Sequence, residues 1–265
     1  MAISNTVILT QGDEYVQTSD ARHPLGTRGV TVEGKVFVYS KAGATGLGIA
    51  RLMQAEAPQG KISLDINPAT ATAPTITTTA FSLALASAET IAADEFKDGF
   101  LFINDGVGEG QMVSLAGNTA VTSGTALDVY LKPQASFTVA PTTACEVGVG
   151  KNKYDDIIVR PDSARTSVPL GVTPRAVTAN YYFWLQTWGY APVKTVGTLT
   201  VGCPVSDDTC SSTGTAGAVH TMRTTSTGYA PAAGAAHVAQ GFEIGNCVIV
   251  GKTGETSVID LKISP

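Results

Sequence analysis

Two glycine-rich stretches are the first candidates for chemistry, because backbone N–H groups in such loops can bind phosphate. The stretch GVGEG at 106–110 lacks the Gly-x-Gly-x-x-Gly spacing of a dinucleotide-binding turn, and no βαβ pattern surrounds it. Gly251-Lys252-Thr253 resembles the end of a phosphate-binding loop, but Asn246 stands where that loop needs its first glycine. We therefore expect both stretches to form turns.

The titratable residues do not form a metal-binding or acid–base pattern. Asp155-Asp156 and Asp207-Asp208 are adjacent pairs, and neighbours on a strand point to opposite faces, so neither pair can act as a carboxylate dyad. A calcium site at one of these pairs is the alternative. No Gly-x-Ser-x-Gly elbow occurs. The histidines are isolated in the sequence: His23, His220 and His237. We expect no catalytic residues, no cofactor and no metal, and hence no enzyme.

The four cysteines match no zinc-binding spacing. Cys203 and Cys210 could bridge a short loop, but in a chain made in the cytosol we expect reduced thiols. The others are Cys145 and Cys247.

The aromatic run at 181–188 is the strongest strand pattern in the chain. We expect Tyr182, Trp184 and Trp188 to share one face and to lie in the core or at a subunit interface, because residues two and four apart on a strand point the same way. Stacking of Trp184 and Trp188 on a glycan is the alternative.

The secondary-structure elements that must hold these residues in place are predominantly strands. Short β-branched and aromatic runs alternate with turn signals every 8–12 residues, a spacing typical of β-sandwiches and barrels. We expect a mostly β protein with little helix. The predicted strands include a hairpin at 30–40 around Gly34, and Thr256–Ile263 near the C-terminus. Residues 84–96 favour a short helix by their Ala, Leu and Glu content.

The charge distribution divides the chain into three predicted parts. Residues 1–58 have no net charge and comprise an N-terminal arm and the hairpin; residues 59–162, with net charge −6, form an acidic β domain. Residues 163–265, with net charge +1, form a barrel-like domain. The total of −5 disfavours binding of nucleic acid, and no apolar stretch is long enough for a membrane span.

The N-terminal arm has too little apolar area to fold alone. It has enough, however, to add a strand or hook to another surface. We predict that the arm and the start of the hairpin contact a partner through the following residues: Val7, Ile8, Leu9, Tyr15, Arg22, His23 and Arg28.

Three stretches together resemble virion proteins of tailed bacteriophages. They are RHPLGT at 22–27 running to YSKAGA at 39–44; DGFLFINDG at 98–106 followed by GEG; and YYFWLQTWG at 181–189 followed by VGCPV at 201–205 and GTAGAV at 214–219. The last is similar to the β-barrel of phage head decoration proteins.

The resemblance implies a decoration or cement protein on the outer capsid surface. It would be made in the bacterial cytoplasm, would form homotrimers and would clamp subunits of the major capsid protein. A tail or adaptor protein and a carbohydrate-binding module are the alternatives. Neither nucleic acid nor a membrane is expected as a partner.

Overall fold

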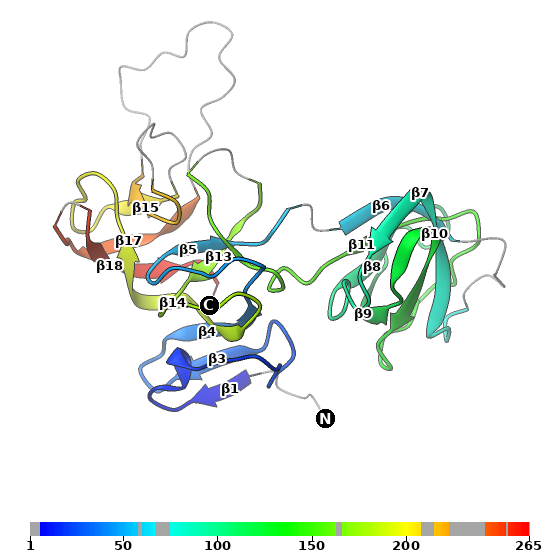
Figure 1. Cartoon of the computed structure of the whole chain (residues 1–265), viewed down its shortest axis with the longest axis horizontal. Helices are drawn as coiled ribbons and strands as arrows, with labels where there is room; N and C mark the ends of the chain where they lie inside the picture. Colours follow the sequence, from blue (N-terminus) through cyan, green and yellow to red (C-terminus); the bar gives the residue numbers. More distant parts are fainter. Residues whose placement is uncertain are drawn as a thin grey trace, which may run out of the picture. The chain divides into compact units, whose positions relative to one another are not determined.

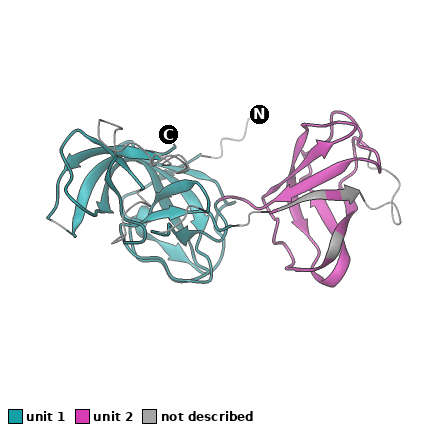
Figure 2. Ribbon diagram, turned by 90° about the horizontal axis from the view of Figure 1, so that it is seen from above, with its two compact units in different colours: residues 1–57, 154–265 teal, residues 58–153 magenta. Residues whose placement is uncertain are grey.

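The chain forms two compact β units in the computed structural model, which describes residues 6–57, 60–66, 75–162, 166–207, 215–222, 242–252 and 254–264 (Figure 1). One unit comprises residues 1–57 and 154–265, and the other comprises residues 58–153 (Figure 2). The acidic part predicted at 59–162 largely coincides with the second unit. The predicted first and third parts belong to a single unit, because their strands pair with one another.

Six antiparallel strands close the second unit into a barrel, in the order β10-β7-β6-β11-β8-β9. Among the described strands of this unit, closure leaves none as a free edge that could pair with another chain. Its strands are β6 (Gly60–Ile66), β7 (Ala80–Ile91), β8 (Phe100–Asp105), β9 (Met112–Asn118), β10 (Val121–Leu131) and β11 (Glu146–Gly150).

The helix predicted over 84–96 is wrong, because β7 continues as a strand to Ile91. The stretch pairs with β10 on one side and, near its start, with β6 on the other. Leu83, Leu85 and Ile91 are buried in the barrel core. Long-range pairing and burial therefore outweigh the local preference for helix.

The first unit contains a twelve-stranded sheet whose main path runs β1-β3-β4-β14-β18-β17-β15-β16. Strand β2 pairs with β14, whereas β5 pairs with β12 and β13, and β13 also pairs with β14. One 3₁₀ turn, η1 (Asp13–Tyr15), lies near the N-terminus. The strands are β1 (Thr6–Leu9), β2 (Gln17–Thr18), β3 (Arg28–Thr31), β4 (Val36–Lys41), β5 (Leu52–Gln54), β12 (Ile158–Val159), β13 (Pro169–Val172), β14 (Tyr182–Lys194), β15 (Pro204–Ser206), β16 (His220–Thr221), β17 (Glu243–Ile249) and β18 (Thr256–Lys262).

The mostly β class predicted from the sequence is confirmed. The expected hairpin around Gly34 is the β3–β4 pair, and Gly34 has the positive φ of 81° that such a turn favours. Strand β14 joins the unit, since its first half pairs with β4 and its second half with β18. The aromatic run thus lies at the centre of the sheet.

A register shift in β14 separates its two tryptophans. Trp184 lies opposite Tyr39, but the extra residue before Trp188 places Trp188 opposite Val36. Because cross-strand partners share a face and neighbours on a strand alternate, Trp188 lies on the face opposite to Trp184. The prediction that Tyr182, Trp184 and Trp188 share one face is therefore wrong for Trp188, because of the bulge.

A buried ion pair joins residues that are distant in the first unit's sequence. The Arg160 guanidinium pairs with the Asp207 carboxylate, and both side chains are almost completely buried. Arg160 also donates hydrogen bonds to the Gln54 side chain (2.8 Å) and the Ser167 carbonyl (2.7 Å). The other Asp207 oxygen accepts one from the Phe242 N–H (2.7 Å). These bonds satisfy charges that would otherwise be costly to bury.

Candidate partner-binding surface around the N-terminal segment

The N-terminal segment packs on its own unit. Strand β1 runs parallel to β3 in a register that places Val7 opposite Gly29. Strand β2 pairs with the start of β14. Arg175 donates a 2.6 Å hydrogen bond to the Tyr15 carbonyl, and the Thr178 N–H donates one of 2.8 Å to the Gln17 side chain. The segment predicted as an arm is therefore paired into the sheet of its own unit, and its contact with a partner stays a prediction.

The turn between β1 and β2 is organised by two acidic side chains. Asp13 accepts hydrogen bonds from the hydroxyl (2.7 Å) and the N–H (2.9 Å) of Thr10, and these lower the pKa of its carboxyl. Glu14 accepts a bond of 2.8 Å from the N–H of Gly12, whose φ is 102°. Asp13 and Glu14 therefore shape the turn that brings Tyr15 to the surface.

An aromatic cluster lies beneath this segment. The Tyr39 ring is 5.0 Å from that of Trp184 and 5.9 Å from that of Tyr182, with which it is stacked. The His23 ring lies edge-on to Tyr39 at 5.2 Å and 5.5 Å from Trp184. The Tyr39 hydroxyl accepts a 3.0 Å hydrogen bond from the Arg22 N–H. The cluster thus has an apolar body with polar groups at its rim.

Gly29 allows the close packing of this cluster. A Cβ atom at position 29 would lie 2.8 Å from both the Leu9 Cδ1 atom and the Trp184 Cζ3 atom. Leu9 is only 3% exposed and Trp184 only 5%. The absence of a side chain at Gly29 is therefore what lets β1 approach the sheet.

A cleft of about 160 Å³ opens between the segment and the aromatic cluster. It contains six of the ten residues that the sequence predicted for partner contacts or for the aromatic face. Its lining residues are Val7, Leu9, Asp13, Val16, Thr18, Arg22, His23, Tyr39, Tyr182 and Trp184.

The four other predicted residues lie outside this cleft. Ile8 is 69% exposed on β1 and Tyr15 is 49% exposed on η1, so both face solvent beside the cleft. Arg28 is exposed at the start of β3. Trp188 is half-buried on the other face of the sheet. A contact of any of these residues with a partner stays a prediction.

Sequence reasoning missed Tyr39, although it contacts three other aromatic rings. Its sequence neighbours give no sign of this role, because the contact arises from pairing of β4 with β14, more than a hundred residues later. Val16 and Thr18 were missed because the segment lacks strand periodicity.

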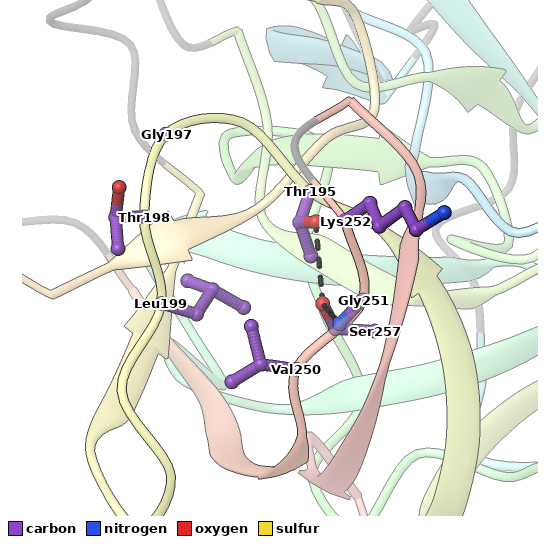
Figure 3. Close-up of a pocket in the computed structure, with 8 residues that line it drawn as sticks. All are labelled: Thr195, Gly197, Thr198, Leu199, Val250, Gly251, Lys252 and Ser257. Carbon is purple, nitrogen blue, oxygen red and sulfur yellow. Dashed lines mark hydrogen bonds between the residues drawn. The ribbon is translucent and has the colours of Figure 1, made fainter.

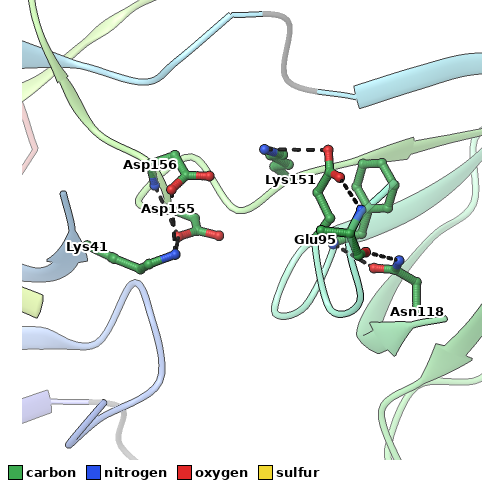
Figure 4. Close-up of polar contacts among 8 residues, drawn as sticks. Lys41, Glu95, Asn118, Lys151, Asp155 and Asp156 are labelled. Carbon is green, nitrogen blue, oxygen red and sulfur yellow. Dashed lines mark hydrogen bonds and ion pairs between the residues drawn. The ribbon is translucent and has the colours of Figure 1, made fainter. Parts of the chain in front are cut away.

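A polar cluster adjoins the aromatic one, since Lys41 lies opposite Tyr182 across β4 and β14. The Lys41 amine pairs with Asp155 at 3.2 Å and Asp156 at 3.5 Å (Figure 4). Burial alone would lower the pKa of Lys41, but the two carboxylates outweigh it and raise the pKa. Burial, and then the neighbouring Asp156, raise the pKa of Asp155. Asp155-Asp156, one of the two pairs considered as a calcium site, thus forms ion pairs with Lys41.

The barrel unit has its own polar contacts. Lys151 pairs with Glu95 at 3.5 Å, and the Asn118 side chain accepts a hydrogen bond of 2.8 Å from the Phe96 N–H (Figure 4). Asn118 also donates one of 2.9 Å to the Ala92 carbonyl. These bonds hold the loop between β7 and β8, and their role is structural.

A second cleft, of about 330 Å³, lies between the loop that follows β14 and the connection between β17 and β18 (Figure 3). It includes the Gly251-Lys252 stretch, which forms a connection between β17 and β18 as expected. The Thr195 and Ser257 hydroxyls share a hydrogen bond of 3.3 Å, and Ser257 also accepts one from the Gly251 N–H. The described lining contains no His, Cys, Asp or Glu and so offers no acid–base pair. It is lined by Thr195, Gly197, Thr198, Leu199, Val250, Gly251, Lys252 and Ser257.

Within the described ranges, no three His, Cys, Asp or Glu residues gather where they could hold a metal ion. No helix among the described residues is long and apolar enough to cross a membrane. Asp208, Cys210 and His237, which were considered as site residues, lie outside the described residues. Comparisons with protein-family models, curated proteins and solved structures find no match for the chain.

Proposed function

We propose that this chain is a structural virion protein of a tailed bacteriophage, a decoration protein that binds the outside of the head and bridges shell subunits. The observation that carries the proposal is the surface of the N-terminal segment. There Ile8 and Tyr15 expose apolar area beside an aromatic-lined cleft. Apolar and aromatic side chains gathered around a concavity favour contact with another protein.

The free edge of the sheet supports this surface as the attachment site. Strand β1 ends the main path of the sheet as described, and its sequence Thr-Val-Ile-Leu contains neither the proline nor the lysine that commonly protects an edge. An extended segment of a shell subunit can hydrogen-bond to such an edge. The binding surface of the proposal is thus β1, η1 and the cleft between them and the aromatic cluster.

The two-unit organisation also fits a bridging role. Each unit has its own apolar core, so each can fold around its own contacts. Attachment through more than one surface raises the overall affinity without requiring strong single contacts. Residues 58–153 carry a net charge of −4, which favours a protein partner over the phosphates of packaged DNA. A homotrimer would multiply these attachments further.

The glycan-binding alternative requires Trp184 and Trp188 to form one stacking surface. Trp184 is buried under the N-terminal segment, and Trp188 lies on the opposite face of the sheet. The two rings therefore cannot form one stacking surface for a sugar.

The experiment is reconstitution with empty shells of the major capsid protein encoded in the same genome. The purified chain should sediment with the shells, appear on their outer surface in electron micrographs and have a trimer mass by light scattering before binding. Failure to bind shells would contradict the proposal. Binding in a ring at the portal vertex or tail would instead identify the tail or adaptor role.

A further inference from the structure

Cys203 and Cys247 lie opposite each other at the end of the β15–β17 pair. Pro204 pairs with Asn246, and one residue further the Cys247 N–H donates a 3.0 Å hydrogen bond to the Cys203 carbonyl. The Gly202 N–H donates one of 2.8 Å to the Cys247 carbonyl. Both cysteines are free thiols in the structure. The backbone therefore holds two thiol-bearing residues as cross-strand neighbours.

The two side chains share a face of the sheet. Cys247 is buried in the apolar cluster that also contains Val205, two residues beyond Cys203 on its strand. Because residues two apart on a strand point the same way, Cys203 is directed to the side on which Cys247 lies. Cross-strand neighbours on one face have Cβ atoms within the range from which a disulfide can close with small adjustments.

We propose that Cys203 and Cys247 are a thiol-oxidation site that closes into a disulfide when the protein meets a disulfide oxidant such as oxidised glutathione. The Cys203 thiolate attacks one sulfur of the oxidant, forming a mixed disulfide and releasing one glutathione thiolate. The Cys247 thiolate then attacks the Cys203 sulfur and releases the second. The protein loses two protons and two electrons, and oxidised glutathione is reduced to two glutathione molecules.

The order of attack follows from exposure. Cys203 is partly exposed, whereas Cys247 is buried, so an oxidant in solution reaches Cys203 first. Burial, and next the neighbouring Cys203, raise the pKa of the Cys247 thiol, which makes it the slower nucleophile. Cys145, buried in the barrel unit, accepts a hydrogen bond from the Thr142 N–H and donates one to the Val107 carbonyl. It serves as an internal control that should not react.

The test uses the native full-length chain, oxidised with glutathione disulfide, alkylated under denaturing conditions and digested with trypsin without reduction. Cleavage after Lys194, Arg223 and Lys252 puts Cys203 and Cys210 in one peptide and Cys247 in the next. We expect these two peptides to be joined, with a mass lower than their sum by about 2 Da for the two hydrogens lost. The Cys210→Ser variant should give the same link.

The variants also separate the two steps. Cys247→Ser should stop at a glutathione adduct on Cys203, whereas Cys203→Ser should leave Cys247 unmodified in the native protein. An internal Cys203–Cys210 disulfide in the wild-type peptide would overturn the proposal. A persistent glutathione adduct on Cys203 with Cys247 present would overturn it too. If a serine variant fails to fold, fragmentation of the joined wild-type peptides decides the matter, because the fragment masses show whether Cys203 or Cys210 carries the link.

Discussion

Replacement of Trp184 by alanine should destabilise the first unit by about 3–5 kcal/mol. The side chain is 5% exposed, and its ring contacts those of Tyr39 and His23. An aromatic side chain of this kind buries roughly 200 Å². At about 25 cal/mol per Å², that burial stabilises the unit by about 5 kcal/mol. The loss in the variant is smaller, because the alanine methyl group stays buried. The cavity left beside Gly29 keeps the loss near this range, because the sheet cannot collapse into it.

The assay is urea unfolding followed by tryptophan fluorescence. The chain has two tryptophans, both in the first unit, so Trp188 remains in the variant and reports that unit alone. Circular dichroism follows both β units together, so a barrel transition that does not coincide with the fluorescence transition should stay in place. Tyr190→Ala, an exposed position on the same strand, is the matched control and should change stability by less than about 0.5 kcal/mol. A loss below about 1 kcal/mol for Trp184→Ala would refute the assignment of this ring to the core.

The other predictions concern the ion pair, the glycine and the pH dependence. Asp207→Ala should cost about 3–5 kcal/mol in the same fluorescence assay, because it leaves the Arg160 charge buried without its partner, and Arg160→Met with Asp207→Leu should recover most of the loss. Gly29→Val should cost about 1–3 kcal/mol and speed hydrogen exchange in β1, because its side chain would overlap Leu9 and Trp184; unchanged exchange would count against the packing described. The free energy of unfolding should fall as the pH rises above about 10. The pKa of Lys41 is higher in the folded protein than its ordinary value of 10.5, so its contribution to stability is complete below pH 10.5 and disappears as the pH rises through the folded pKa. The pKa of Tyr182 is raised by burial, so the unfolded chain ionises first above its ordinary value of 10.0 and adds to the loss. Lys41→Met should make the fall shallower between about pH 10 and pH 12, and an identical slope would contradict the sign.

Local patterns in the sequence were sufficient for the fold class and for several strands. The β3–β4 hairpin has a glycine turn between β-branched runs, and β18 is a short alternating stretch, so each is visible within a few residues. The helix prediction for residues 84–96 is wrong because the composition of this stretch favours a helix, whereas the strand that pairs with it is distant in sequence. Propensity describes an isolated segment, and here the barrel decides its conformation.

The candidate surface could be predicted only in part. The apolar triplet around Ile8 and the aromatic run were visible as unusual compositions, and the structure brings Val7, Leu9, Tyr182 and Trp184 together. The fit of Gly29 under Leu9 and Trp184 could not be predicted, because it depends on parallel pairing of β1 with β3. The bulge that turns Trp188 to the other face has no signature in the sequence. Such features arise from register, which single-sequence periodicity does not specify.

Binding of surface variants to empty shells tests the central claim most directly. Ile8→Glu with Tyr15→Ser changes two exposed side chains beside the cleft and leaves the buried contacts of Leu9 intact. Val32→Glu, at a residue 90% exposed in the β3–β4 turn, is the control for charge alone. Occupancy on the shells, measured by quantitative gel after sedimentation, should fall at least about tenfold for the double variant, a loss of about 1.4 kcal/mol or more, and should not change for Val32→Glu. Equal occupancy of the double variant and the wild-type protein would contradict attachment through the N-terminal segment.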